Sequence, residues 1–208
     1  MSNIYQTYQT RFDEILVPVA RTLEQMFLET LFDEIHIDRI SVRAKSPTSF
    51  LKKAQSLNDE GATHYQAPLD QIQDQIGARI IVYYTDDVIK IHESVLKYFR
   101  PIEIKSHVPE NQWEFGYFGQ HFILILPNDV WVGGVRPENS PVFFELQIKT
   151  LFQHAWSEAN HDLSYKGDML QGLDVHRKLA LASAQAWGAD QIFNDLSAQL
   201  QRNQTASQ

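Results

Sequence analysis

The 208-residue chain contains no cysteine. Disulfide bonds, thiolate nucleophiles and zinc sites built on thiolates are therefore excluded. Long apolar runs are also missing, since the longest strongly apolar stretch, "FILIL" at 122–126, is far too short to cross a bilayer. The N-terminal segment "MSNIYQTYQTRFDEI" lacks the basic and then apolar pattern of a secretion signal. We therefore expect a cytoplasmic protein with no membrane partner.

Positive charge is scarce, with 18 Lys and Arg against 26 Asp and Glu and a net charge of −8. Proteins that bind along the phosphate backbone of nucleic acid are usually basic, because counterion release drives that binding. Broad nucleic-acid binding is therefore disfavoured, although a local basic pocket is compatible with this balance. Hydrophobic residues make up 43% of the chain, which is enough for a packed core in one compact domain.

Alternation of apolar and polar residues with period two predicts five β-strands. They lie at 35–43, 78–85, 102–106, 119–126 and 142–150. Apolar residues at three- and four-residue steps predict an N-terminal amphipathic helix that is kinked or interrupted at Pro18, which lacks the N–H that the helix needs. Further helices are predicted from Ser46, after Asp86–Asp87, at 151–166 and from about Leu173 to Leu200.

The order of these elements is helix, strand, helix, strand, helix and then three strands, which is not the regular alternation of a doubly wound sheet. It predicts an α+β fold, with a mixed β-sheet of about five strands flanked by helices. We expect a single domain over 1–200, with a core at about 36–166 and flanking helices at 3–33 and 173–200. The polar stretch 201–208 is expected to be a disordered tail.

The strand "VFFELQIKT" at 142–150 carries an unusual polar face. One face is apolar, formed by Val142, Phe144, Leu146 and Ile148. The other presents a carboxylate, an amide and an ammonium group in a row, from Glu145, Gln147 and Lys149. A strand that buries one face needs nothing special on the other, so this row is either a solvated face or a reaction surface.

A basic stretch, "RAKSPTSFLKK", spans the end of the first strand and the start of the next helix. Arg43 and Lys45 are two residues apart on a strand end and point to one face, while Ser49 and Lys53 share a face of the helix. Together they could direct cations and a hydroxyl group at a triphosphate beside a helix N-terminus. Taken alone, the stretch is better explained as a solvated basic start of a helix.

Two further stretches supply polar residues at strand ends or loops. In "DQIGAR", Asp74 can hold Mg²⁺ through its oxygens, and the flat guanidinium of Arg79 can stack on a base or bind a phosphate. Aspartate and glycine are also common turn residues, so Asp74 and Gly77 could equally form a simple turn. In "FGYFGQHF", Tyr117 lies between two glycines and is followed by His121, which suits either stacking on a purine or a hairpin-like loop with a packed tyrosine. Glu145 could share a metal with Asp74 and accept a proton from a hydroxyl nucleophile.

Taken in order, these motifs resemble the synthetase domain of the RelA/SpoT family. The motifs are R-x-K-S-P-x-S-x-x-x-K, D-x-x-G-x-R, G-Y-x-x-x-H, E-x-Q-I-K-T and "QHAWSEANHDLSYK", between about Arg39 and Lys166. Members of that family have a nucleotidyltransferase-like sheet and move the β,γ-pyrophosphate of ATP to the 3′-hydroxyl of GDP or GTP, which gives the alarmones ppGpp or pppGpp and AMP. The length implies a small single-domain synthetase without a hydrolase domain.

The resemblance also implies roles for individual residues. Arg43 and Arg79 would enclose the adenine of ATP, and its phosphates would be held by Lys45, Ser49 and Lys53. Asp74 would bind Mg²⁺, with Glu145 as the catalytic base and second metal ligand. The acceptor base would stack on Tyr117, with His121 and Gln147 beside it. These roles favour a reaction surface on the strand at 142–150.

The sequence departs from the family motifs on the acceptor side. Gly119 stands where a serine is usual, Lys149 replaces an arginine, and the loop "SHVPENQWEF" lacks the basic run of the long guanosine-specific enzymes. Acceptor identity therefore stays open between a guanosine nucleotide, an adenosine nucleotide that would give (p)ppApp, and the 3′-CCA end of tRNA, which toxic members modify. An inactive nucleotide sensor, or a partner of an antitoxin, is the alternative outside catalysis.

Two other features concern the helices. His154, Glu158, His161 and Tyr165 share one face of the helix at 151–166, and their spacing favours a structural hydrogen-bonded cluster over a metal site. Small members of the family often form tetramers through their terminal helices. The apolar stripes at 8–27 and 173–200 are compatible with such a homo-oligomer.

Overall fold

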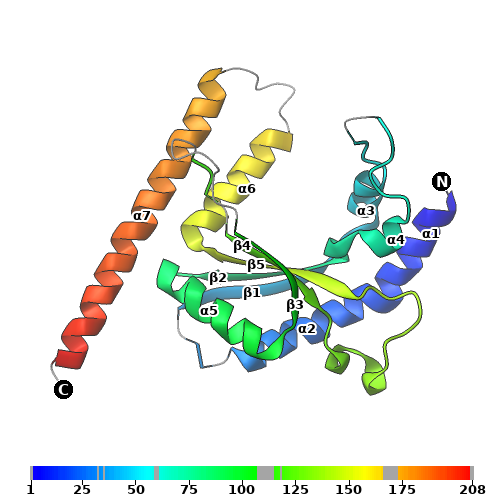
Figure 1. The fold of residues 1–208 in the computed structure, drawn as a ribbon, viewed down its shortest axis with the longest axis horizontal. Coiled ribbons are helices and arrows are strands. Elements are labelled where there is room, and N and C mark those ends of the chain that lie inside the picture. Colours follow the sequence, from blue (N-terminus) through cyan, green and yellow to red (C-terminus); the bar gives the residue numbers. More distant parts are fainter. Residues whose placement is uncertain are drawn as a thin grey trace.

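A five-stranded mixed sheet forms the centre of the computed structural model, which describes residues 2–31, 33–34, 36–58, 61–106, 115–117, 119–165 and 173–206 (Figure 1). The strands are β1 (Ile37–Ala44), β2 (Ile76–Val82), β3 (Pro101–Ser106), β4 (Gln120–Ile125) and β5 (Phe143–Thr150). Their order is β1-β2-β5-β4-β3, and β2 and β5 are parallel while the other neighbours are antiparallel. The α+β class and the number of strands predicted from the sequence are confirmed.

Helices surround this sheet. The longer ones are α1 (Ser2–Arg11), α2 (Val17–Thr30), α3 (Pro47–Ala54), α5 (Thr85–Tyr98), α6 (Leu151–Tyr165) and α7 (Leu173–Ala206). Short helical segments are η1 (Phe12–Leu16), α4 (Pro68–Gln71), η2 (Gln73–Gln75), η3 (Asn128–Val130) and η4 (Val132–Gly134). In Figure 1, α2 runs below the sheet, α1 lies at the right beside α3 and α4, α6 stands above the sheet, and α7 lies beside α6 at the edge of the molecule. None of the described helices is both long and apolar enough to cross a membrane.

The apolar face of the sheet packs against α2 and α5. Phe144, Leu146 and Ile148 of β5 are fully buried, as the alternation in the sequence predicts. Phe27 of α2 contacts Phe144 edge-on, with ring centroids 6.1 Å apart, and Phe122 of β4 receives the ring of His92 from α5 at 5.0 Å. Because the core fills one face, the polar row of β5 lies on the opposite face of the sheet, the side on which α6 stands.

The N-terminal helix is interrupted near Pro18, as predicted, but the irregular part precedes the proline. Residues Phe12–Leu16 form a π-helical turn, and Pro18 lies in the first turn of α2, where no intrahelical N–H bond is required of it. The buried side chain of Arg11 comes directly before the π-helical turn. Single π-helical turns are frequent at functional sites.

The C-terminal helix is longer than the sequence indicated. α7 continues to Ala206, so the prediction of a disordered tail is wrong over 201–206, and the last two residues lie outside the described part of the chain. Gln, Arg and Ala in this stretch are good helix formers, and the Thr205 hydroxyl donates to the Gln201 carbonyl at 3.0 Å. The loop predicted at 107–118 falls mostly outside the described residues.

Candidate active site

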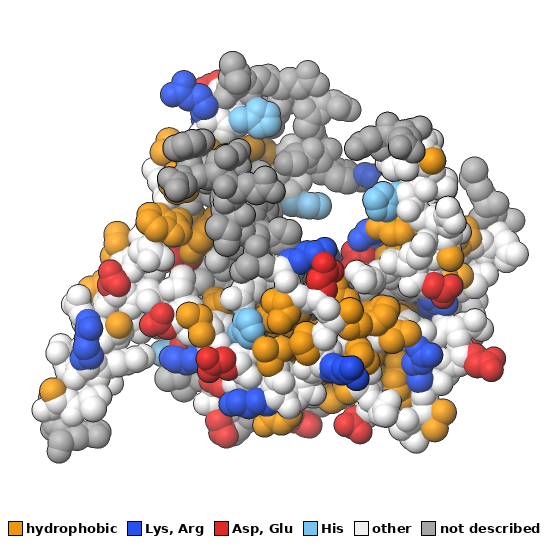
Figure 2. Space-filling view, in the orientation of Figure 1, with side chains coloured by type: hydrophobic (Ala, Val, Ile, Leu, Met, Phe, Trp, Pro, Cys, Tyr) orange, Lys and Arg blue, Asp and Glu red, His pale blue; other side chains and the backbone are white. Residues whose placement is uncertain are grey.

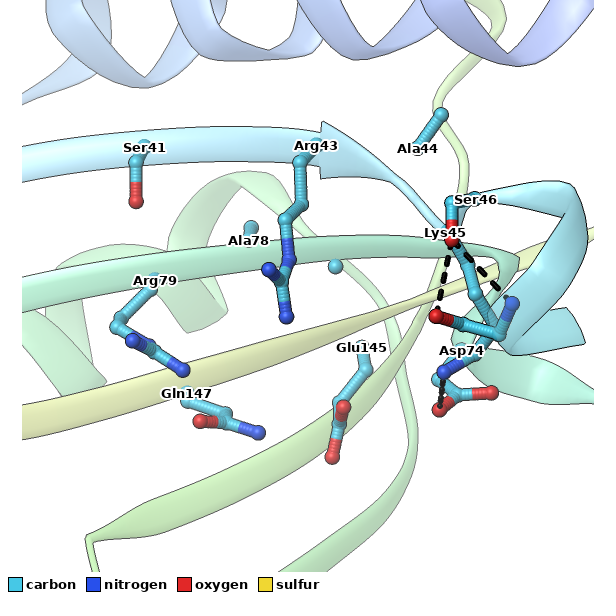
Figure 3. Close-up of a pocket in the computed structure, with 12 residues that line it drawn as sticks. Ser41, Arg43, Ala44, Lys45, Ser46, Asp74, Ala78, Arg79, Glu145 and Gln147 are labelled. Atoms are coloured by element: carbon cyan, nitrogen blue, oxygen red, sulfur yellow. Dashed lines mark hydrogen bonds and ion pairs between the residues drawn. The ribbon is translucent and has the colours of Figure 1, made fainter. Parts of the chain in front are cut away.

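A cleft of about 310 Å³ opens on the polar face of the sheet, between the strands and the start of α3 (Figure 3). It is lined by Ser41, Arg43, Ala44, Lys45, Ser46, Ser49, Asp74, Gly77, Ala78, Arg79, Glu145 and Gln147. Figure 2 shows side chains of both charges meeting in a hollow between the two upper parts of the molecule. This volume lies at the lower end of the range of small-molecule sites, about 300–1,000 Å³.

The register of the strands brings the predicted residues together. Two rows of paired residues cross the sheet, Arg43–Gly77–Glu145 and Ser41–Arg79–Gln147–His121. Since alternate residues of a strand point to the same face, both rows face the cleft. A Cβ atom on Gly77 would have no protein atom within 4 Å, so this glycine leaves open space between Arg43 and Glu145.

Asp74 also lines the cleft and forms ion pairs with two lysines. Its Oδ2 atom is 2.9 Å from Nζ of Lys45 and 3.0 Å from Nζ of Lys53. Burial alone would raise the pKa of Asp74, but the two ammonium groups outweigh burial and hold the pKa below its usual value. The second oxygen, Oδ1, is buried and has no hydrogen-bond partner among the described residues. Asp74 is therefore ionised and presents one oxygen that can still accept a ligand.

Helix α1 holds the Asp74 end of the cleft in place. Tyr8 donates a hydrogen bond to the Lys45 carbonyl at 2.9 Å and stacks on Phe50 of α3, with centroids 3.7 Å apart. Arg11 donates to the side chain of Gln75 at 3.0 Å, next to Asp74. In the sequence, Tyr8 is only one member of an apolar stripe, and Arg11 has no predicted role. In the structure, Tyr8 contacts Lys45 directly, and Arg11 contacts Gln75, the residue after Asp74.

Glu145 is the second carboxylate of the site. Nδ1 of His121 lies 3.1 Å from Oε1 of Glu145. Burial would raise the pKa of Glu145, but the hydrogen bond and charge of His121, together with a hydrogen bond from Gln147, outweigh burial and lower the pKa. An ionised carboxylate held by a histidine is suited to accept a proton or to bind a cation.

The two carboxylates fit a magnesium ion that shares its coordination with a substrate. Within the described ranges, no group of three or more His, Asp or Glu side chains forms a self-contained metal site. Mg²⁺ takes oxygen ligands and often keeps only one or two carboxylates, with substrate phosphates and water completing its shell. The free Oδ1 of Asp74 and the nearby carboxylate of Glu145 match that requirement.

The two arginines differ in how firmly they are held. Arg79 forms an ion pair with Glu158 of α6 at 3.0 Å and lies 3.4 Å from Nδ1 of His154. Arg43 forms no hydrogen bond or ion pair within the part of the chain that the structure describes, and it points across the cleft (Figure 3). The predicted hydrogen-bonded cluster on α6 is therefore partly present. His154 and Glu158 lie close together, and both contact Arg79 of β2. His161 is exposed, and the side chain of Tyr165 lies outside the described residues.

Three of the predicted residues lie outside the lining of the cleft. Lys53 and His121 still join it through Asp74 and Glu145. Tyr117, in contrast, directs its hydroxyl group at Asp190 of α7, 2.5 Å away. The structure therefore brings the predicted ATP side and both carboxylates together but leaves the tyrosine beside α7.

Gly119 and Lys149, the two residues that depart from the motifs, pack against each other. A Cβ atom on Gly119 would lie 2.3 Å from the Ile148 carbonyl oxygen and 2.4 Å from Cγ of Lys149. A serine at 119 would require the backbone of β5 to move, so glycine is needed here. Lys149 is 4% exposed and donates to the hydroxyl of Ser157 on α6 at 3.0 Å. Gly119 and Lys149 therefore both contribute to the packing of β4 and α6 against β5.

Lys149→Met is expected to increase the free energy of unfolding at pH 7 by about 1–3 kcal/mol. Burial, and then the charge of Arg79, lower the pKa of Lys149 to about 8. Between about pH 8 and 10.5 the folded wild type releases a proton that the unfolded chain keeps, so its free energy of unfolding rises with pH. The gap in free energy of unfolding between Lys149→Met and the wild type therefore narrows over this range. Urea unfolding at pH 7 and pH 10 measures this change. The exposed Lys97→Met is the control, and a gap for Lys149→Met that does not narrow would contradict the prediction.

The chain is similar to several known proteins. A family model described as the region found in RelA and SpoT proteins matches residues 42–169. GTP pyrophosphokinase YjbM of Bacillus subtilis (strain 168) is 26% identical over 210 residues, which cover 94% of this chain and 93% of that protein. The crystal structure of small alarmone synthetase 1 from Bacillus subtilis matches with a TM-score of 0.71 at 22% identity, over 93% of this chain and 99% of that chain. The same synthetase bound to its product pppGpp gives a TM-score of 0.68 at 21% identity, over 96% and 99%.

Proposed function

This chain belongs to the RelA/SpoT family, and from that premise we propose that it is a nucleotide 3′-pyrophosphokinase. It transfers the β,γ-pyrophosphate of ATP to the 3′-hydroxyl of GDP or GTP, and releases AMP. The relative named GTP pyrophosphokinase YjbM supports this type of reaction. The observation that carries the proposal is the cleft itself, in which two arginines, two lysines and two carboxylates gather around one open space.

ATP binds on the side of β1, β2 and α3. Arg43 and Arg79 come from neighbouring strands and line the same space, which supports a role for their planar guanidinium groups in enclosing the adenine ring. Lys45 and Lys53 lie next to that space, and Ser49 lines it from the first turn of α3. The structure of small alarmone synthetase 1 from Bacillus subtilis bound to AMPCPP, an ATP analogue by its chemistry, supports ATP as a ligand of this chain.

The lysines exchange one anion for another when ATP binds. In the free protein, both ammonium groups share one anion, Oδ2 of Asp74. The phosphates of ATP offer more negative charge than one carboxylate, so Lys45 and Lys53 turn toward them. Asp74 then has both oxygens available for the cation that accompanies ATP. Bound Mg²⁺ supplies neutralisation of the charge on the phosphate oxygens.

Glu145 acts as the general base. It accepts the proton of the acceptor 3′-hydroxyl, whose oxygen forms a bond to the β-phosphorus while the bond from that phosphorus to the α-phosphate oxygen breaks. AMP leaves with the bridging oxygen. His121 orients the Glu145 carboxylate through its 3.1 Å contact, and Gln147 lines the cleft one step along the strand. Reactions of this type depend on positioning and charge neutralisation more than on covalent catalysis.

The acceptor is a guanosine nucleotide in this proposal. The name of the curated relative and the pppGpp bound to the synthetase of Bacillus subtilis support that assignment. An adenosine nucleotide and the 3′ end of tRNA are the competing acceptors, because Gly119 and Lys149 change the acceptor side of the sheet.

A transfer assay tests the reaction and the acceptor together. The protein is incubated with β-labelled ATP and Mg²⁺, and with GDP, GTP, ADP, AMP and deacylated tRNA in parallel. The expected result is AMP release with label on GDP or GTP. Label on another acceptor would correct the acceptor and keep the reaction class. No transfer to any of them, with ATP still bound in calorimetry, would replace the enzyme by a nucleotide sensor.

We also propose that α7 mediates self-association into a homo-oligomer, for which a tetramer is one candidate. This helix exposes several large apolar side chains, Leu181, Trp187, Ile192, Phe193, Leu196 and Leu200, each between 48% and 62% exposed. Such a set on one long helix is unusual for a monomer. Light scattering of the purified protein measures the assembly, and a monomer at micromolar concentration would overturn this part of the proposal.

A further inference from the structure

Asp190 of α7 is a buried carboxylate that the proposed reaction does not use. Its side chain has no solvent exposure, and burial raises its pKa above the usual value. Oδ2 accepts two hydrogen bonds, from the hydroxyl groups of Tyr117 and Thr150, each at 2.5 Å. Oδ1 is buried and has no hydrogen-bond partner among the described residues. The carboxylate therefore depends on these two hydroxyl groups for its stabilisation.

The two hydroxyl groups come from two different segments of the chain. Thr150 is the last residue of β5, the strand that carries Glu145. It also fixes the start of α6, because Gln153 N–H donates to its hydroxyl at 3.0 Å while Thr150 N–H donates to the Gln153 side chain at 2.9 Å. Tyr117 belongs to the short described segment before β4. Asp190 thus joins this segment to the end of the catalytic strand.

A second contact ties the same segment to α7. The rings of Phe115 and Trp187 lie with centroids 6.4 Å apart, one helical turn before Asp190. Trp156 of α6 donates to the Leu179 carbonyl of α7 at 3.3 Å, so α7 is itself fixed against the helix that holds Arg79. α7 therefore contacts both α6 and the segment that carries Tyr117.

We propose that Asp190 is a positioning residue that sets where the Tyr117 ring stands for the acceptor base. The inference rests on the proposed function, since it assigns Tyr117 to the acceptor. The phenol hydroxyl is occupied by Asp190, so what Tyr117 offers to a ligand is the face of its ring. Aromatic stacking on a base is sensitive to the placement of that ring. Without the bond to Asp190, the ring samples more orientations and acceptor binding weakens.

The test compares Tyr117→Phe, Asp190→Ala and the double variant. Tyr117→Phe keeps the ring and removes only the hydroxyl group, so it folds even where Asp190→Ala, which removes the acceptor oxygen, proves unstable. We expect each single variant to raise the acceptor KM about 10-fold, with the KM for ATP unchanged. The double variant should be no worse than either single one, because both changes remove the same bond. Asp195→Ala, which removes an exposed carboxylate on the same helix, is the matched control.

The outcomes separate this inference from the proposed function. A wild-type protein that transfers to no acceptor overturns the proposed function, and this inference with it. Normal wild-type transfer with an unchanged acceptor KM in Tyr117→Phe overturns the inference alone. Equal changes in the KM for ATP and for the acceptor, or additive effects in the double variant, would show a general structural role and also overturn it.

Discussion

Glu145→Gln is expected to lower kcat for pyrophosphate transfer by a factor of about 10²–10⁴. The amide has nearly the shape of the carboxylate but cannot accept the proton of the 3′-hydroxyl. Glu145 is ionised in the structure because its interactions with His121 and Gln147 together outweigh the effect of burial on its pKa. ATP affinity should remain close to that of the wild type, since the groups proposed to hold ATP lie on other elements. Steady-state transfer and calorimetry with ATP measure the two quantities.

Glu138→Gln is a suitable control for this variant, because Glu138 is an exposed carboxylate in the loop before β5. It should leave transfer unchanged. A Glu145→Gln protein that retains more than about a tenth of wild-type kcat would rule out general-base catalysis by this residue. A loss of ATP binding equal to the loss of transfer would instead place Glu145 in the ATP site.

Asp74→Asn should lower kcat by a factor of about 10² or more and raise the Mg²⁺ concentration needed for half-maximal activity. The amide offers one neutral oxygen in place of a carboxylate, so it binds a cation poorly. Without Mg²⁺, the same change should strengthen ATP binding a few-fold, because Lys45 and Lys53 lose the anion that now neutralises them. The opposite signs of these two effects distinguish a metal ligand from a residue that only maintains the fold.

Calorimetry with ATP in the presence of a chelator, and Mg²⁺ titrations of the transfer rate, measure both effects of Asp74→Asn. Asp129→Asn, an exposed aspartate in η3, controls for the loss of one negative charge. Weaker ATP binding without Mg²⁺, or an unchanged Mg²⁺ requirement, would argue against the proposed role of Asp74.

Local periodicity accounts for what the sequence predicted well. The five strands lie within a few residues of their predicted ranges, because period-two alternation reflects one buried and one open face. The same alternation placed Glu145 and Gln147 on the face opposite the core. Ser46 caps α3 as expected, with its side chain accepting from Ser49 N–H at 3.3 Å. Spacing within one strand or one helix is enough for such predictions.

Contacts between segments that lie far apart in the sequence could not be predicted from it. Asp190 meets Tyr117 across 73 positions and Arg11 meets Gln75 across 64, and no local pattern encodes either pairing. Glu158 was recognised on a polar helix face, but its partner Arg79 belongs to β2 and is set by how α6 packs. The length of α7 was missed because a polar stretch can form a helix or remain disordered with little difference in local propensity.

An arginine that is already held in place loses little more conformational freedom when a ligand packs against it. Arg79 is in that state through Glu158, whereas ordering Arg43 costs about 0.5–1.5 kcal/mol of side-chain entropy on binding. In the proposed ATP complex, half of the side-chain ordering around the adenine ring is therefore complete when the protein folds. We therefore expect Glu158, whose side chain is 55% exposed, to contribute to ATP affinity from outside the cleft by reducing this entropy cost.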